Sequence, residues 1–256
     1  MRSVKAAWVC VLLGVAVQGS FMFNGGSFWQ ITASVLLLTA ASVLLLWRNV
    51  GARAAVLAAA GVVLVTFLAE AIGVATNFPF GEYAYSGGLG WSLLGVSLIV
   101  PFAWLMMAYP AWEIANRIIT WGGKKGVAAK IVLASWAMVA WDVFLDTQMV
   151  AAGNWSWQNP EPSLIGTPGI PLTNYLGWFV VSTLIMLIFA WCFKEVKKNK
   201  TATGQYPLYA IYLWTWLGSV VANLTFWQRP GLALVGGIAM GTVAVWLLIV
   251  LRRRPA

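Results

Sequence analysis

The chain has 256 residues, of which 61% are hydrophobic and only 9% are charged. Soluble domains carry about 25% charged residues, so this composition excludes an ordinary water-soluble domain and indicates a protein that faces lipid. The chain has 16 Lys and Arg residues and only 7 Asp and Glu residues. Such an excess indicates nucleic-acid binding only where the basic residues form a patch on a soluble surface, and here they are distributed as in a membrane protein. We therefore expect no nucleic-acid partner.

Eight apolar runs follow one another along the chain, and each is long enough for a transmembrane helix. Eight spans of about 20 residues use most of the length and leave only short connections. The sequence therefore predicts an all-α, polytopic membrane helix bundle of about eight transmembrane helices, with residues 1–256 forming a single transmembrane domain. The runs cover residues 6–23, 31–47, 54–75, 92–109, 127–146, 172–193, 206–227 and 232–251.

The basic residues give the orientation of these runs. The first run continues to Phe23 without a clear small-residue cleavage site, so we expect a retained helix rather than a secretory signal. With the N-terminus in the cytoplasm, eight crossings leave only Arg229 outside, which predicts a multi-pass protein of the cell membrane with both N- and C-termini cytoplasmic. The residues then inside are Arg2, Lys5, Arg48, Arg53, Arg117, Lys124, Lys125, Lys130, Lys194, Lys197, Lys198, Lys200, Arg252, Arg253 and Arg254.

Three carboxylic acids are expected inside the membrane, in the outer leaflet. Glu70 lies about one turn before the outer end of the third run, and Asp142 and Asp146 lie in the last turns of the fifth. A spacing of four residues puts the two aspartates on one helix face, with Cβ atoms about 5–6 Å apart. A carboxylate near the middle of a span costs roughly 2.5–3.5 kcal/mol, and nearby carboxylates repel unless protons or cations intervene. A functional site explains these three residues better than packing does.

Polar residues of three further runs fall at a matching depth: Gln18, Asn174 and Asn223. Asn174 and Asn223 would contribute to a site there, or would simply bridge helices through hydrogen bonds. The connections at residues 76–91 and 147–171 are rich in Tyr, Trp, Gly and Pro. We expect these two long connections to cover the cluster as a lid.

Other polar and aromatic residues have a structural interpretation. Glu113 forms an i, i+4 pair with Arg117, and Glu195 lies among lysines, so both acids are expected to be solvated at cytoplasmic helix ends. Trp178 and several other tryptophans fall near the ends of runs, where their amphipathic rings would lie at the membrane interface.

The residue types exclude several kinds of chemistry. The sequence contains no histidine, which removes the usual ligands of haem and non-haem iron and leaves no imidazole base for a nucleophile. No lysine lies inside an apolar run, so a retinal Schiff base has no attachment point. The basic stretch at residues 122–126 lacks P-loop spacing. What remains is acid–base chemistry by carboxylic acids on a lipid, with no metal and no other cofactor.

Three ordered blocks of sequence resemble the CruF-type carotenoid hydratase family. They are residues 70–85 (EAIGVATNFPFGEYAY), residues 141–157, which contain WDVFLDTQM and GNWSW, and residues 169–178 (GIPLTNYLGW). The resemblance covers about residues 64–182. The chain departs from the family at Asn77, where members have Gly, and at Thr147, where members have Pro. Without that proline, the fifth helix is expected to run further.

The resemblance implies an enzyme that adds water across a terminal isoprenoid C=C of an acyclic or monocyclic carotenoid, without a cofactor, to give a tertiary alcohol. The catalytic residues would be Glu70, Asp142 and Asp146, since two carboxyls forced together titrate as a pair in which one keeps its proton. Aromatic faces could stabilise a carbocation. The substrate-binding residues would be Tyr83, Tyr85, Trp141, Trp155, Asn174 and Asn223. The partners would be a carotenoid or other isoprenoid lipid, the bilayer, and other enzymes of carotenoid biosynthesis.

Two other functions stay open at this point. Asp142 and Asp146 form a DxxxD pair that could hold magnesium and a diphosphate, as in a UbiA-like prenyltransferase of isoprenoid lipids. Such an enzyme needs a second acidic motif and binds diphosphate on the cytoplasmic side. Glu70 and Asp142 would also suit the relay groups of a non-enzymatic proton-coupled transporter, although no inverted repeat is evident.

Overall fold

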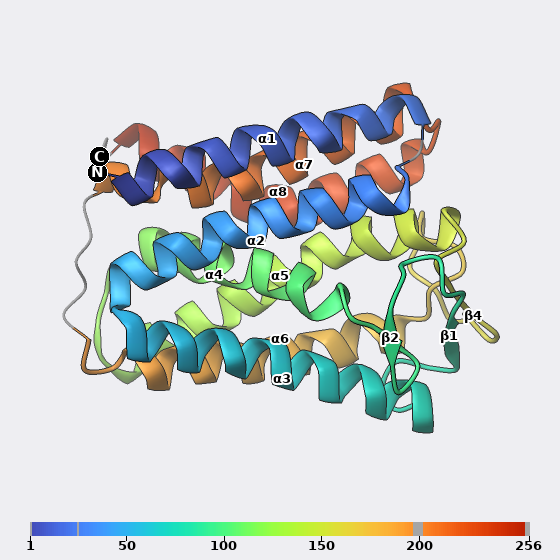
Figure 1. The fold of residues 1–256 in the computed structure, drawn as a ribbon, viewed down its shortest axis with the longest axis horizontal. Coiled ribbons are helices and arrows are strands. Elements are labelled where there is room, and N and C mark those ends of the chain that lie inside the picture. The colour runs from blue at the N-terminus through green and yellow to red at the C-terminus, as the bar shows by residue number, and fades with distance from the viewer. Residues whose placement is uncertain (1, 25, 197–201, 254–256) are drawn as a thin grey trace.

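A computed structural model describes residues 2–24, 26–196 and 202–253, and within these ranges the chain folds into eight α-helices (Figure 1). Short strands and one short 3-10 helix, Ala202–Gln205, lie in the connections. The prediction of an all-α membrane bundle is confirmed. The helices are α1 (Arg2–Asn24), α2 (Phe28–Val50), α3 (Ala52–Thr76), α4 (Val100–Ile118), α5 (Gly123–Ala151), α6 (Leu172–Phe193), α7 (Tyr206–Thr225) and α8 (Pro230–Arg253).

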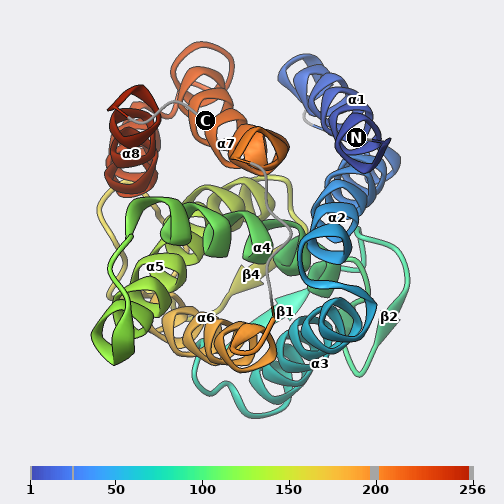
Figure 2. The ribbon, with the colours of Figure 1, turned by 90° about the vertical axis from the view of Figure 1, so that its left-hand side faces the viewer.

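Six of the helices in the described ranges are long and apolar enough to cross a membrane, namely all except α4 and α7. Large apolar side chains such as Leu12, Leu64 and Ile238 are exposed on the outside of the bundle, as a lipid-facing surface requires. α4 is buried along most of its length, and Figure 2 shows it inside the ring formed by the other helices. α4 therefore meets neighbouring helices rather than lipid on most of its sides.

The fourth apolar run is placed differently from its prediction. Instead of a helix over residues 92–109, the structure has an antiparallel hairpin of β2 (Ser92–Leu93) and β3 (Val96–Ser97), and then α4 from Val100 to Ile118. Leu94 and Gly95 between the strands have positive φ angles of 50° and 79°, which a helix cannot contain. The helix begins only at Val100, where a proline in its first turn is favourable.

The shift of α4 also changes the position of Glu113. Its side chain is 2% exposed and lies inside the bundle, so the prediction that Glu113 is solvated is wrong. The reason is that α4 extends beyond the predicted run and is enclosed by its neighbours, which carries Glu113 into the interior. Glu195, in contrast, is exposed beside Lys194, with 3.6 Å between the charged atoms, as predicted.

The two departures from the family pattern have simple structural consequences. Asn77 ends α3 in the left-handed conformation, with φ of 64°, which Asn tolerates better than any residue except Gly. Thr147 continues α5, and its hydroxyl donates to the Val143 carbonyl at 2.9 Å. α5 then runs on to Ala151. The prediction of a longer fifth helix is confirmed.

The two long connections at one end of the bundle are joined by a small β-ribbon. Strand β1 (Tyr83–Tyr85) pairs antiparallel with β4 (Trp155–Trp157) in the register Tyr83 with Trp157 and Tyr85 with Trp155 (Figure 1). Because side chains alternate along a strand, these four aromatic rings share one face of the ribbon, and Ala84 and Ser156 lie on the other. We call this end of the molecule the ribbon end.

Phe80 anchors the ribbon to the helices. Its ring is buried between Gly73 of α3 and Gly177 of α6, and it stacks on Trp178 with ring centroids 4.7 Å apart. A Cβ atom at Gly177 would lie 2.8 Å from the Phe80 ring, so only glycine at this position leaves room for the Phe80 side chain. The Trp157 indole donates to the Phe80 carbonyl at 2.9 Å and holds β4 to the same point.

The opposite end of the bundle carries the basic residues, and we call it the basic end. α1 begins there and α8 ends there (Figure 1). Arg2, Lys5, Arg48, Arg252 and Arg253 lie in the helix turns at this end. Of the basic residues used to predict the orientation, Lys197, Lys198, Lys200 and Arg254 lie outside the described residues, as do the two tag positions, Met1 and Ala256. By the positive-inside rule, we expect the basic end to face the cytoplasm.

We predict that reporter tags at Met1 and Ala256 are both cytoplasmic, whereas a tag inserted near Asn159, in the connection at the ribbon end, is exposed outside. The measurement is protease or thiol-reagent accessibility in intact cells compared with lysed cells. Tags at the two termini on opposite sides of the membrane would contradict this topology.

Candidate functional site

The three carboxylic acids singled out from the sequence line a single cavity. Glu70 of α3 and Asp142 and Asp146 of α5 are all buried, and Asn174 of α6 joins them. The cavity has a volume of about 20 Å³. A cavity needs at least about 10–15 Å³ to hold one water molecule, so this one has room for a single water among the acids.

Asn174 connects α6 to the two aspartates of α5. Its side-chain amide donates to Asp146 Oδ2 at 2.5 Å and approaches Asp142 Oδ2 at 3.5 Å. The Asp142 and Asp146 carboxyls lie close enough to hydrogen-bond to each other, which requires a proton between them. Asn174 therefore bridges two helices and also completes the cavity.

The ribbon supplies hydrogen-bond donors to Glu70. The Tyr83 hydroxyl donates to Glu70 Oε2, and Tyr85 lies beside the same carboxyl. The pKa values of Tyr83 and Tyr85 are raised well above the usual value for tyrosine, mainly by burial and secondly by the charge of Glu70. Both phenols therefore keep their protons and act as donors.

Aromatic rings form the rest of the cavity wall. Trp104 of α4 stacks on Trp178 of α6 with ring centroids 3.9 Å apart, and Trp155 and Trp157 of the ribbon close the other side. The prediction that Trp178 lies at the membrane interface is wrong, because its ring is buried in this wall. Trp104 gave no signal in the sequence, since a tryptophan in an apolar run looks like any other packing residue.

Not all predicted site residues reach the carboxyl cavity. Seven of them line it: Glu70, Asp142, Asp146, Asn174, Tyr83, Tyr85 and Trp155. Trp141 lines a neighbouring, larger cavity together with Gln18. In the part of the chain that the structure describes, Asn223 lines neither cavity and its amide donates to the Ser219 carbonyl of its own helix at 2.8 Å. Asn223 is therefore not among the residues we assign to the site.

The fold and the cavity together define a polytopic membrane protein that encloses a cluster of acids and a water-sized space beneath an aromatic ribbon. A family described as carotenoid biosynthesis protein matches residues 30–248, so the chain belongs to this family. The resemblance inferred from the sequence blocks is thereby confirmed.

A more specific relative is also found. A bisanhydrobacterioruberin hydratase of Haloarcula japonica is 31% identical over 140 residues, which make up 54% of this chain and 45% of that protein. The match thus spans less than half the length of this curated relative. No solved structure matches the chain.

Proposed function

We propose that this protein is a carotenoid hydratase of the cell membrane that adds water across a terminal isoprenoid C=C of an acyclic or monocyclic carotenoid. The observation that carries the proposal is the carboxyl cavity, in which three buried acids surround the space of about one water molecule. Membership of a carotenoid biosynthesis family and similarity to a hydratase support the same reaction.

Protonation of the alkene is the first step that the reaction needs. Hydrogen bonds donated to a carboxyl group favour its ionised form. Asp146 accepts such a bond from Asn174, and Glu70 accepts one from Tyr83. The Asn174 amide approaches Asp142 only at 3.5 Å, and the other partner of Asp142 is the Asp146 carboxyl. We therefore assign Asp142 as the acid, whose proton goes to the less substituted carbon of the terminal double bond.

Water then captures the cation at the more substituted carbon. The aromatic wall of Trp104, Trp155 and Trp178 presents ring faces that can stabilise this positive charge. As the oxygen–carbon bond forms, Asp146 or Glu70 accepts the proton that water loses. The product is a tertiary alcohol, and transfer of this proton from the base that accepted it to Asp142 restores the acid.

The balance of this reaction requires neither an oxidant nor a reductant, because one molecule of water is added and no electrons are exchanged. We therefore propose that the enzyme works without NAD(P)H, flavin, oxygen or metal. The carboxyls supply both the acid and the base that hydration needs.

Pigment analysis in a carotenoid-producing host tests this proposal. We expect cells that express the gene to accumulate a carotenoid with a tertiary hydroxyl group at the end of the chain, and cells without it to accumulate the unhydrated precursor. Chromatography with mass spectrometry distinguishes the two pigments. Identical pigments in both strains, with the protein present in membranes, would contradict the proposed activity.

A further inference from the structure

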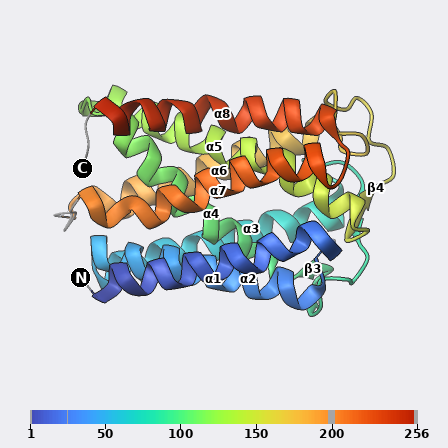
Figure 3. The ribbon, with the colours of Figure 1, turned by 90° about the horizontal axis from the view of Figure 1, so that it is seen from above.

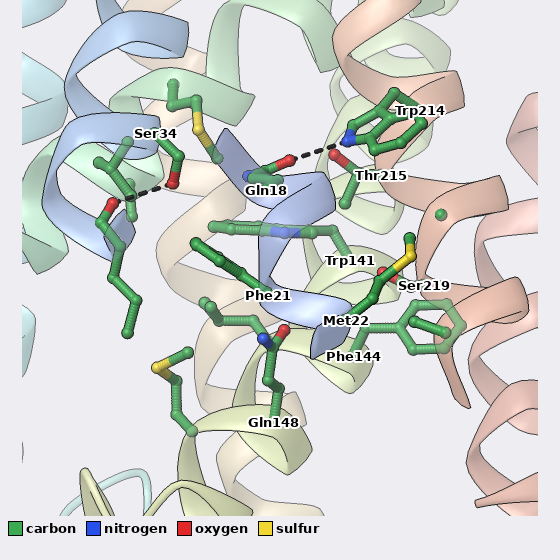
Figure 4. A pocket seen from close by; sticks show the side chains of 18 of the residues that line it. Gln18, Phe21, Met22, Ser34, Trp141, Phe144, Gln148, Trp214, Thr215 and Ser219 are labelled. Atoms are coloured by element: carbon green, nitrogen blue, oxygen red, sulfur yellow. Dashed lines mark hydrogen bonds between the residues drawn. The ribbon is translucent and has the colours of Figure 1, made fainter. Parts of the chain in front are cut away.

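A second, larger cavity lies next to the carboxyl cavity. It has a volume of about 110 Å³ and is enclosed by α1, α2, α4, α5 and α7 in the half of the bundle toward the ribbon end. Figure 4 shows the rings of Phe21, Trp141 and Phe144 and the thioether of Met22 around it. These side chains make the cavity apolar and aromatic, as a site for a hydrocarbon chain would be.

Three polar side chains of this wall, Gln18, Ser34 and Thr215, are already paired with protein atoms. Gln148 and Ser219 also line the cavity. Trp214 of α7 donates to Gln18 of α1 at 2.9 Å, as Figure 4 shows. Ser34 donates to the Ile31 carbonyl at 2.9 Å, and Thr215 donates to the Ile211 carbonyl at 2.8 Å. Because Gln18, Ser34 and Thr215 already have partners, they offer little to a polar ligand. Most of the other lining side chains are aliphatic or aromatic, so the cavity suits a largely apolar ligand.

The larger cavity and the carboxyl cavity share one lining residue. Leu145 of α5 lines both cavities. On the same helix, Trp141 lines the larger cavity and its neighbour Asp142 lines the smaller one. A double bond held in the larger cavity therefore lies next to the turns of α5 that carry the proposed acid.

The seam between α1 and α7 leads from this cavity toward the lipid. The two helices run side by side in Figure 3, and Met22, Gly218 and Ser219 of the cavity wall are partly exposed. At the ribbon end of the seam, the Phe23 and Phe226 rings meet edge to face with centroids 5.7 Å apart. A Cβ atom at Gly218 would meet only the Trp214 ring, at 3.5 Å, so the position next to the cavity is open.

We propose that this larger cavity binds the end of the substrate's isoprenoid chain, which enters from the lipid between α1 and α7. This inference rests on the proposed hydratase function. The volume of about 110 Å³ has room for only a few groups the size of a water molecule, so most of a carotenoid stays in the membrane. The enzyme therefore recognises an unmodified end of the substrate chain and does not discriminate between pigments by their total length.

Gly218→Leu tests this inference, because the leucine side chain fills the opening without a backbone clash and suits a helix better than glycine. The parent protein is Glu70→Gln, in which the pigment is bound without turnover, purified in nanodiscs from a carotenoid-producing host. We expect Gly218→Leu to reduce the pigment retained per protein by about tenfold or more, because the added side chain occupies space that the chain end needs. Tenfold corresponds to about 1.4 kcal/mol. Leu217→Phe is the control, because Leu217 of the same helix is 51% exposed on the lipid side.

The outcomes separate this inference from the proposed function. Equal pigment in the Gly218→Leu protein and its parent, or no pigment in the parent while the wild type is active, would overturn the chain-end site. In a third outcome, the parent retains pigment, Gly218→Leu loses it, and the wild-type protein never hydrates it. This outcome would support the chain-end site and refute the hydratase activity.

Discussion

Asp142→Asn is expected to lower the rate of carotenoid hydration by about a hundredfold or more, the usual size of a general acid's contribution. The change keeps the shape of the side chain and removes the proton that the alkene must receive. The cavity should survive, because an asparagine can still hydrogen-bond to Asp146 beside Asn174. The measurement is the ratio of hydroxylated to unhydrated carotenoid at equal amounts of membrane protein.

Asp146→Asn is expected to have an intermediate or equally large effect. Without the Asp146 carboxyl, Asp142 loses the partner that shares its proton, and the cavity loses one of its two possible bases. Glu113→Gln is the matched control, because Glu113 is a buried acid toward the basic end, and Glu195→Gln is an exposed one. Near-normal hydroxylated carotenoid from Asp142→Asn would mean that the aspartates are structural.

Glu70→Gln is expected to cause a loss of the same order, about a hundredfold or more, because it removes a carboxyl that faces the same water-sized space. Tyr83→Phe should cost less, about tenfold to a hundredfold, since a hydrogen bond to a charged group contributes about 1.5–3 kcal/mol. The phenol acts only through Glu70 in this scheme. A larger loss of hydration from Tyr83→Phe than from Glu70→Gln would contradict the proposal that Tyr83 acts through Glu70.

The acids of the site could be predicted from the sequence because the membrane makes them conspicuous. Glu70, Asp142 and Asp146 interrupt long apolar runs, and the four-residue spacing of the aspartates fixes their common face. Asn174 was predicted from its depth and from the sequence block at residues 169–178, whereas Asn223 was predicted from depth without such a block and does not line the site. Depth in the membrane does not say which way a helix is rotated, and Asn223 hydrogen-bonds to its own helix instead.

The places of Trp104 and Trp178 in the aromatic wall, the pairing of the ribbon strands and the start of α4 could not be predicted from the sequence pattern. The ribbon strands have only three residues each, too few for alternation to stand out from a loop. Residues 92–97 are apolar enough to look like part of a helix, and only the turn at Leu94 and Gly95 shows otherwise. The burial of Glu113 and Trp178 depends on α4 being central, which is a property of the packing.

The position of the acids also bears on the alternative functions. A UbiA-like prenyltransferase would need a second acidic motif facing Asp142 and Asp146, and the cavity offers Glu70, Tyr83 and Tyr85 there. A magnesium diphosphate would be held by the carboxylate oxygens of several acidic residues. One carboxyl group with two phenols beside it suits proton transfer better. The family of the chain points in the same direction.

Isotope labelling in heavy-oxygen water tests the central claim most directly. The purified protein is reconstituted in vesicles with a carotenoid that has an unmodified end, without NAD(P)H, flavin, oxygen or added metal. The proposal predicts a tertiary alcohol whose hydroxyl oxygen carries the solvent label, as read by mass spectrometry. A parallel reaction is run in ordinary water under labelled molecular oxygen. A product that carries the label from molecular oxygen there, or that forms only when a redox cofactor is supplied, would contradict hydration by the carboxyl cavity.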